Sequence, residues 1–226
     1  MNYNILFITA LKSELSAIKN NIKKEKNYYF KILNCGLINS LYNLTLYINE
    51  IKPAIIIHTG ICGSLYKDFK VSDIVFPTNV FLFENGYFYN ENNYSYFNIV
   101  NYPEISCNNQ KIINAAKKLN YFTGNFVSGN SAVFSKQKRF ELNRNFNAVA
   151  VDMELFSVAF LCNKYNIKLF SVKVISDTIE DNLTEENNDI NKFITKENFN
   201  NSLNSLANFF NKNFDYFFNL LKEGEL

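Results

Sequence analysis

Short apolar runs alternate with amphipathic segments along most of the chain. Runs of strand length occur at 3–10, 28–36 and 54–60, and each is followed by a turn or by a segment whose apolar residues recur at helical spacing. Further strands are predicted at 121–129, 148–151 and 167–177. The alternation has no linker and no internal repeat, so the pattern predicts a single α/β domain over residues 1–226 with a mostly parallel or mixed sheet.

The helices are predicted between these runs. One over 37–51 is followed by Pro53, which cannot continue a helix. Others are predicted at 11–24, 108–120, 135–146 and 153–166, and from about residue 190 onwards. Two predicted turns carry glycine. One is "TGICGSL" at 59–65, and the other is Asn85-Gly86, a pair that suits the type I′ turn of a hairpin over 79–89.

Composition narrows the class of protein. A chain of 226 residues that is 47% hydrophobic can bury a substantial core. Its net charge is +2 and its only arginines are Arg139 and Arg144, so nothing points to a nucleic-acid partner. The four cysteines lie far apart and His58 is the only histidine, which leaves neither zinc spacing nor a disulfide framework. Free thiols in a reducing cytoplasm are the simplest interpretation.

The membrane can be set aside at this stage. No apolar stretch reaches the length of a membrane span. The first apolar run lacks a basic segment before it and is interrupted by Lys12 and Glu14, so we interpret it as a strand rather than a signal peptide.

Acidic residues follow several of the predicted strands. Glu14 follows the first strand, Asp152 and Glu154 follow "AVAV", and Asp177 ends the long late strand after Ser176. Ligands of such sheets bind at the carboxyl ends of strands, so these carboxylates are expected to converge on one mouth. Each also has a plain structural explanation: an N-cap for Asp152, a first-turn acid for Glu154, a turn cap for Asp177 and a solvated helix position for Glu14.

The other polar residues near these strand ends are less specific. Gly60 and Gly63 permit close approach of the backbone to a ligand, but "GICG" is neither a P-loop nor a dinucleotide motif. His58 lies inside an apolar strand, as a hydrogen-bonded core histidine does. Cys62 has no second histidine to serve as its base, so we interpret it as a small apolar filler rather than a nucleophile.

The chain resembles the nucleoside phosphorylase/hydrolase superfamily in five segments that occur in the family's order and spacing: "TGICGSL", "VSDIVFPT", "VSGNSAVF", "AVAVDMELFSVA" and "VKVISD". The likeness is greatest to the 5′-methylthioadenosine/S-adenosylhomocysteine nucleosidases and covers nearly the whole chain. It implies a nucleoside phosphorylase-like α/β fold, in which a single domain has a central mixed, barrel-like sheet flanked by helices. Members of that family are commonly dimeric.

The resemblance also implies roles for single residues. Glu154 matches the glutamate that accepts hydrogen bonds from the ribose 2′- and 3′-hydroxyls, and Met153 the methionine beneath the sugar. Asp177, oriented by Ser176, matches the acid that protonates the purine at N7. Glu14 matches the acid that activates the attacking water. The two acids must differ in protonation at one pH, and we expect burial to raise the pKa of Asp177 more than that of Glu14.

Departures from the family's pattern bear on the substrate. The superfamily's phosphorylases hold phosphate with arginines near the N-terminus and after the glycine turn, where this chain has none, so water is favoured as nucleophile. In a phosphorylase, Lys12 or Lys67 would have to substitute. Nucleosidases usually have Gly-Asp-Ala-Phe-Ile where this chain has Gly-Asn-Ser-Ala-Val at 129–133, so Ala132 replaces the stacking phenylalanine. The remaining expected substrate contacts are Gly60, Gly63, Val133 and Phe134.

The sequence thus predicts a cytoplasmic purine nucleoside N-ribohydrolase that acts on methylthioadenosine and S-adenosylhomocysteine with no cofactor and no metal. Its expected partners are a small-molecule purine nucleoside and a second copy of the chain, docked through the 79–89 hairpin, with no nucleic acid and no membrane. The alternatives are a futalosine or aminodeoxyfutalosine hydrolase, a phosphate-dependent purine nucleoside phosphorylase, and a nucleoside-binding protein that has lost catalysis.

Overall fold

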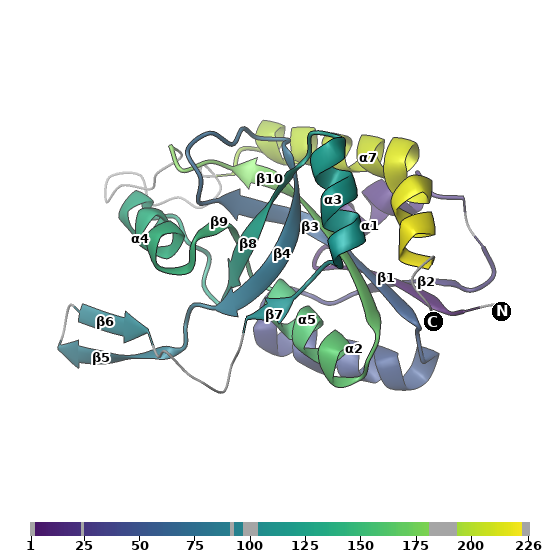
Figure 1. Ribbon diagram of the computed structural model, residues 1–226, viewed down its shortest axis with the longest axis horizontal. Helices are drawn as coiled ribbons and strands as arrows, with labels where there is room; N and C mark the ends of the chain where they lie inside the picture. The colour runs from purple at the N-terminus through teal and green to yellow at the C-terminus, as the bar shows by residue number, and fades with distance from the viewer. Residues whose placement is uncertain (1–2, 24, 91–92, 97–103, 181–193, 223–226) are drawn as a thin grey trace.

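The apolar runs pair into one main sheet, in the order β10-β4-β8-β9-β3-β1-β2, with β7 added beside β4 (Figure 1). The computed structural model describes residues 3–23, 25–90, 93–96, 104–180 and 194–222, but not the side chains of 87–96. The strands are β1 (Ile5–Thr9), β2 (Tyr28–Ile32), β3 (Ile55–Ser64), β4 (Ile74–Leu82), β5 (Gly86–Asn90), β6 (Asn93–Tyr96), β7 (Ile105–Ser106), β8 (Phe122–Ser128), β9 (Ala148–Asp152) and β10 (Lys168–Asp177).

Part of this sheet closes on itself. The long strand β3 pairs in parallel with β10 along its whole length and antiparallel with β9 at its end. Strand β4 pairs antiparallel with β10 and in parallel with β8, and β8 pairs in parallel with β9, which completes the ring. Strands β1 and β2 extend the sheet from the first half of β3. The predicted mixed, barrel-like sheet is therefore confirmed.

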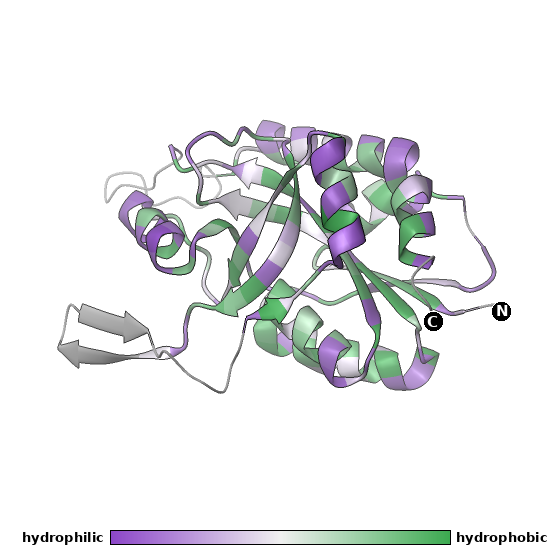
Figure 2. Cartoon of the chain, viewed as in Figure 1, coloured by the Kyte–Doolittle hydropathy of each residue, from purple (hydrophilic) through white to green (hydrophobic). Residues whose placement is uncertain are grey.

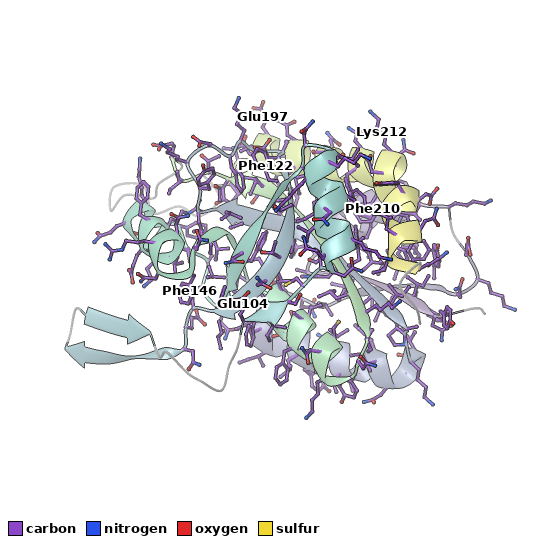
Figure 3. The ribbon with its side chains drawn as sticks, viewed as in Figure 1. Glu104, Phe122, Phe146, Glu197, Phe210 and Lys212 are labelled. Atoms are coloured by element: carbon purple, nitrogen blue, oxygen red, sulfur yellow. The ribbon has the colours of Figure 1, made fainter. Side chains whose placement is uncertain are left out.

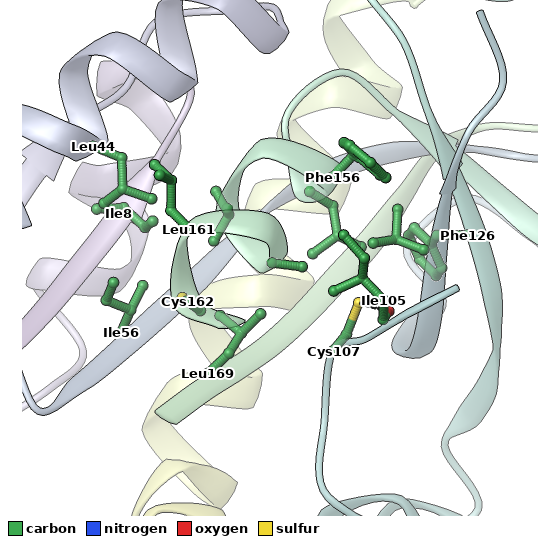
Figure 4. Close-up of a cluster of buried hydrophobic side chains, with 14 of the residues drawn as sticks. Ile8, Leu44, Ile56, Ile105, Cys107, Phe126, Phe156, Leu161, Cys162 and Leu169 are labelled. Carbon is green, nitrogen blue, oxygen red and sulfur yellow. Dashed lines mark hydrogen bonds between the residues drawn. The ribbon is translucent and has the colours of Figure 1, made fainter. Parts of the chain in front are cut away.

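Helices cover both faces of the sheet, as expected for strands that are apolar throughout. Their bounds are α1 (Lys12–Lys19), α2 (Leu37–Ile51), α3 (Gln110–Lys118), α4 (Lys136–Phe146), α5 (Leu155–Lys164) and α7 (Lys196–Lys222). Successive residues of β1 point to opposite faces: Leu6 and Ile8 join the core under α2 and α5, and Ile5 and Phe7 join the core under α1, α3 and α7. Figure 4 shows part of the first core.

The last helix shows how the pattern of the sequence produces this packing. The buried residues of α7 are mostly apolar and recur at helical spacing, and green and purple segments alternate along this helix in Figure 2. Phe210 is buried in the core, whereas Glu197 and Lys212 are exposed (Figure 3). Among the described helices, none combines the length and the apolarity that crossing a membrane requires.

Two local predictions are wrong. The glycines of 59–65 do not end the third strand, because β3 continues to Ser64 and pairs there with β10 and β9. The hairpin is also displaced, because β5 pairs with β6, with Asn90 opposite Asn93, rather than with β4. Residues 91–92, between these two strands, lie outside the described residues. Strand β4 is occupied instead by β8, β10 and β7, which leaves no edge for β5.

The second half of β3 positions the site. Lys173 of β10 pairs in register with Gly60, and Asp177 with Gly63. On the other side, Val151 of the antiparallel strand β9 pairs with Gly63, so the carboxyl ends of β9 and β10 reach the same stretch of β3. The predicted convergence of strand ends is thus present in the fold.

Candidate functional site

A cavity opens where these strand ends meet, between the second half of β3 and the 131–134 loop. It is lined by most of the residues singled out from the sequence, namely Gly63, Val133, Phe134, Met153, Glu154, Ser176 and Asp177. Ala132 also lines it, whereas Gly60 and Glu14 are not among the lining residues; the carboxylate of Glu14 accepts hydrogen bonds from two residues that are, Leu11 and Ile61.

Glu14 is fixed by the backbone on two sides. Its Oε2 accepts a hydrogen bond from the N–H of Leu11 at 2.8 Å, and its Oε1 accepts one from the N–H of Ile61 at 2.9 Å. The side chain is buried, so the solvated helix position is the wrong interpretation. Burial raises the pKa of Glu14, although Lys173 and the backbone N–H groups act in the opposite direction.

Each glycine of "GICG" admits one carboxylate. A Cβ atom at Gly60, whose φ is +149°, would lie 2.6 Å from Oε1 of Glu14. A Cβ atom at Gly63 would lie 2.9 Å from Oδ2 of Asp177. Both distances are too short for any side chain, so glycine is required at these positions for the acids to reach the strand. A direct contact of Gly60 with substrate stays a prediction.

Asp177 is held at the end of β10 by side-chain donors. The hydroxyl of Ser176 lies 2.7 Å from its Oδ1, and the guanidinium of Arg139 forms an ion pair with its Oδ2. All three side chains are buried. Ser176 and Asp177 are thus hydrogen-bonded to each other, and Arg139 is a further partner of Asp177.

Glu154, rather than Asp152, is the N-cap residue of α5; its side chain makes no capping hydrogen bond, and the residue is 5% exposed. Its Oε1 accepts a hydrogen bond from the N–H of Gly36 at 3.0 Å. Burial raises the pKa of Glu154 to about 7, with Asp152 and Glu14 adding to the effect and Lys173 and Gly36 opposing it. The group can therefore change charge near neutral pH.

Asp152 does more than cap a helix. Its carboxylate accepts hydrogen bonds from the N–H of Leu155 and from the hydroxyl of Ser128, the latter at 2.5 Å. It also forms a buried ion pair with Lys173, whose Nζ lies 2.8 Å away. Burial alone would lower the pKa of Lys173, but Asp152, Glu154 and Glu14 together raise it. Lys173 is thus the common counter-charge of the three acids.

His58 lies beside this lysine. Its Nε2 is 3.3 Å from Nζ of Lys173, while its buried Nδ1 has no hydrogen-bond partner among the described residues. Burial and the charge of Lys173 lower the pKa of His58 well below its usual value, so the ring is neutral. His58 is buried, as predicted, but the prediction of a hydrogen-bonded ring holds for Nε2 only, within the described residues.

Arg139 is a residue of this cavity that the sequence interpretation did not place in the site. It is 1% exposed and donates to the carbonyl oxygens of Val133, Ser64 and Thr178, besides its ion pair with Asp177. The sequence did contain a sign that Arg139 is buried, because Arg139 lies three residues before the apolar Leu142 and so shares the inner face of α4. An arginine on an apolar face needs a buried partner.

The loop that contains Asn130 and Ser131 matches the family's purine-binding segment, and another acidic side chain, Glu84, holds it in place. The carboxylate of Glu84 accepts hydrogen bonds from the N–H groups of Asn130 and Ser131, at 2.7 and 2.9 Å. The side chain of Asn130 in turn accepts one from the N–H of Leu37 at 2.9 Å. Asn130, which replaces the family's aspartate, therefore links this loop to α2. In the same loop, the aromatic side chain of Phe134 lines the cavity.

The chemistry of the cavity is set by carboxylates. They offer hydrogen-bond acceptors for hydroxyl groups and sites for proton transfer. Within the described residues, no group of three histidine, cysteine or acidic side chains is arranged to hold a metal ion. A closed mixed sheet whose strand ends place buried acids around a cavity is the arrangement that the resemblance to nucleoside phosphorylases and nucleosidases implied.

Comparison with known proteins agrees with this class. The Phosphorylase superfamily model matches residues 35–211, and the chain belongs to this superfamily. It is 30% identical over 194 residues to a 5′-methylthioadenosine/S-adenosylhomocysteine nucleosidase from Buchnera aphidicola, covering 80% of this chain and 82% of that protein. It is 27% identical over 187 residues to the same kind of enzyme from Staphylococcus aureus, covering 75% and 81%.

Solved structures give the same fold. A Helicobacter pylori nucleosidase mutant with 5′-methylthioadenosine in the active site has a TM-score of 0.76 at 21% identity, covering 96% of this chain and 100% of that one. A futalosine hydrolase of the same organism has a TM-score of 0.77 at 21% identity, covering 96% and 99%. At these identities the structures establish the fold and leave the substrate open.

Proposed function

We propose that the protein is a purine nucleoside N-ribohydrolase that cleaves 5′-methylthioadenosine and S-adenosylhomocysteine with water. The observation that carries the proposal is the pair of buried acids, Glu14 and Asp177, admitted three residues apart on β3 by Gly60 and Gly63. The relatives named above, at up to 30% identity, support this choice of substrate.

The sugar is bound at the α5 end of the cavity. Glu154 accepts hydrogen bonds from the 2′- and 3′-hydroxyls, because an ionised carboxylate is acceptor-only and can hold two donors. The backbone N–H of Gly36 orients it through Oε1. Met153 lines the cavity next to it and provides a soft, polarizable surface under a sugar that develops positive charge.

The bond is broken between the two acids. The oxygen of water bonds to C1′ as the C1′–N9 bond breaks, and Glu14 takes the proton of the water. Asp177 supplies a proton to N7 of the purine, so that the base leaves as a neutral molecule. Glu14 is suited to the role of base because burial raises its pKa above the ordinary value.

Water is a better nucleophile than phosphate in this site. Arg139 is committed to Asp177 and to backbone carbonyls, and Lys173 to Asp152. Both cations therefore have carboxylate partners inside the protein. Lys12, the substitute considered from the sequence, is exposed on α1. A phosphorylase would need a cation that reaches the cavity without breaking one of these ion pairs.

A futalosine or aminodeoxyfutalosine hydrolase is the second candidate. The match to a futalosine hydrolase is as good as that to the nucleosidases, with a TM-score of 0.77. The reaction at the glycosidic bond is the same, so Glu14, Glu154 and Asp177 would keep their roles. The difference concerns the group on the 5′-carbon, which a substrate panel resolves.

The test is a product assay with methylthioadenosine, S-adenosylhomocysteine and aminodeoxyfutalosine, each with and without phosphate. We expect free base and free sugar without phosphate, with the first two substrates preferred. Ribose-1-phosphate derivatives that form only with phosphate would establish a phosphorylase. Tight binding of all three without turnover would establish the nucleoside-binding protein instead.

We also propose that the protein is a homodimer. The described part of the 79–89 segment, with Leu82 and Asn85, borders a groove against Ile38 and Leu41 of α2 and Phe160 of α5. Ile38 is 74% exposed, and exposed apolar residues in one patch are typical of a contact surface. Sedimentation equilibrium tests this, with Ile38→Glu as the disrupting variant and Tyr216→Glu, on the exposed surface of α7, as the control. A monomeric wild type would contradict the proposal.

A further inference from the structure

His58, the chain's only histidine, lies on the same face of the closed sheet as the lysine that the acids share. On the parallel strand β10, the register partner of His58 is Ser171. Lys173 lies two residues further along β10, so its side chain projects from the same face as that of Ser171. The two side chains meet there, with Nε2 of His58 3.3 Å from Nζ of Lys173.

This contact determines which ring nitrogen of His58 carries a proton. An ammonium group has donors and no acceptor, so Nε2 accepts the hydrogen bond from Lys173. The ring is neutral, because burial and the adjacent positive charge both lower the pKa of His58. A neutral imidazole has one proton, and with Nε2 as acceptor that proton is on Nδ1.

The same contact restricts Lys173. Its ammonium group has three N–H donors. One is directed at Oδ2 of Asp152, 2.8 Å away, and a second at Nε2 of His58. Two fixed donors set the rotation of the group. An aliphatic side chain at position 58 would leave Asp152 as the one side-chain hydrogen-bond partner of Lys173 within the described part of the chain.

The other titratable groups around Lys173 are acids and thiols. Asp152 from β9, Glu154 from the start of α5 and Glu14 from α1 raise the pKa of the lysine against the effect of burial, so it is charged. Three thiols also feel its charge, and each is neutral because burial raises its pKa: Cys35, Cys62 and Cys107. The histidine differs from all of these, because it is a neutral hydrogen-bond acceptor for the lysine.

Lys173 acts on the proposed base through its charge. Its register partner Gly60 has no side chain, and the carboxylate of Glu14 takes that space, 2.6 Å from where a Cβ atom would lie. The charge of Lys173 lowers the pKa of Glu14 and that of Glu154, and so opposes the effect of burial on both. In the proposed reaction both acids work in the ionised form. The position of the ammonium group therefore affects the pH range of the reaction.

We propose that His58 is a positioning residue of the hydrolase reaction: as a neutral ring protonated at Nδ1, it accepts a hydrogen bond from Lys173 and holds the ammonium group beside the proposed base, Glu14. His58 is not among the residues that line the cavity, so it acts through Lys173 rather than on the substrate. The proposal rests on the proposed function for its kinetic consequence only.

The direct test observes the tautomer of His58 without any substrate. Because the chain has one histidine, an untagged protein labelled with ¹⁵N-histidine gives a single pair of ring resonances. Their chemical shifts and their couplings to the ring hydrogens identify the protonated nitrogen. We expect the proton on Nδ1 and no titration from about pH 5 to pH 9, a range that includes the ordinary midpoint of histidine. A proton on Nε2, or a midpoint within this range, would overturn the proposal.

Matched lysine variants test the contact itself. Lys173→Met removes the donor, so the Nε2 resonance should shift, whereas Lys168→Met, on the same strand but half-buried, should leave it unchanged. Equal spectra of the wild type and a folded Lys173→Met would contradict the proposal. If Lys173→Met does not fold, the tautomer of the wild type decides.

Two variants of His58 separate positioning from packing. His58→Gln retains a hydrogen-bond acceptor that can reach Lys173, whereas His58→Leu has none. The acid limb of kcat/KM against pH reports the acids of the free enzyme, and in His58→Leu it moves to higher pH by about 1 unit because the lysine favours their ionised forms less. In His58→Gln the limb stays near that of the wild type.

The outcomes distinguish this proposal from the proposed function. Equal losses of activity in His58→Leu and His58→Gln, with no movement of the limb, would mean that the histidine only packs, and would overturn the proposal. A wild type without hydrolase activity would instead contradict the proposed function, and the ring resonances would still test the hydrogen bond to Lys173.

Discussion

The two ends of the cavity hold their acids in different ways. At the end where we propose that the sugar binds, Glu14 and Glu154 accept hydrogen bonds from backbone N–H groups and share one buried lysine, Lys173, which is itself paired with Asp152. At the end where we propose that the purine binds, Asp177 forms an ion pair with Arg139. A glycine of β3 makes room for the acid at each end, so the difference concerns the donors alone.

Because of this difference, the acids at the two ends have different electrostatic surroundings. Neutral N–H groups and a shared lysine do not offset the cost of burying a carboxylate, and the pKa values of Glu14 and Glu154 are raised. Asp177 instead has a guanidinium, that of Arg139, in direct contact with one of its carboxyl oxygens. The expectation that burial would raise the pKa of Asp177 more than that of Glu14 left out Arg139, and it stays untested. The comparison teaches that burial alone does not rank two acids.

The largest effect is expected from removing the shared lysine. Lys173→Met leaves Asp152, Glu154 and Glu14 without their common counter-charge, and breaking a buried ion pair costs about 3–5 kcal/mol. The free energy of unfolding from urea titration measures this. Lys168→Met, on the same strand but half-buried, should change it by less than about 1 kcal/mol. Equal losses in the two variants would mean that Lys173 does not serve all three acids.

The second largest effect is expected from replacing Asp177, the acid proposed to protonate the purine. Asp177→Asn lowers kcat by about 10²–10⁴-fold, because the amide cannot supply a proton to N7, while KM changes little. Steady-state kinetics with the preferred substrate measures the split. Asp68→Asn, an exposed aspartate after β3, is the control and should match the wild type. A rise in KM alone would make Asp177 a binding group rather than an acid.

A smaller loss of activity is expected from replacing Glu14, the proposed base. Glu14→Gln lowers kcat by about 10²-fold, because the base is removed. It also lowers stability by about 1–3 kcal/mol, since an amide presents an N–H group to one of the two backbone donors of Leu11 and Ile61. Kinetics and urea titration measure both changes. Glu197→Gln on the exposed face of α7 should leave both unchanged. Full activity of Glu14→Gln would remove Glu14 from the mechanism.

The smallest effect concerns the pH dependence of stability. The folded-state pKa of Glu154 is about 7, above its unfolded value, so the folded protein binds the extra proton between these values and loses stability as pH rises through 7. In Glu154→Gln this loss is absent. The melting temperature of the variant relative to wild type should therefore be a few degrees higher at pH 8 than at pH 5, since 1 kcal/mol corresponds to about 2–4 °C.

The same variant should lose affinity for its substrate at the pH at which it gains thermal stability. Glu154→Gln should bind methylthioadenosine more weakly at pH 8, because one acceptor oxygen for the ribose hydroxyls is lost. Calorimetry at the two pH values measures this. A variant with unchanged affinity and an unchanged dependence of melting temperature on pH would show that Glu154 is neither the ribose acceptor nor a buried titrating group.

Much of the fold could be predicted because it depends on local patterns. The apolar runs and helical spacing located the strands and helices, and α2 begins and ends where the pattern and Pro53 placed it. The glycines of 59–65 were misjudged, because glycine is as compatible with a close approach inside a strand as with a turn. The choice between them depends on Glu14 and Asp177, which arrive from elsewhere in the chain.

The sequence by itself therefore determined the order of the elements, the family and the acids that reach one mouth, because periodicity and motifs are written in neighbouring residues. Only the tertiary structure decided which donors each acid has. Arg139 lies 38 residues from Asp177 along the chain, and no local pattern records that pair. Since the charge of a buried carboxylate is set by the groups in contact with it, the electrostatics of the site could not be read before those contacts were known.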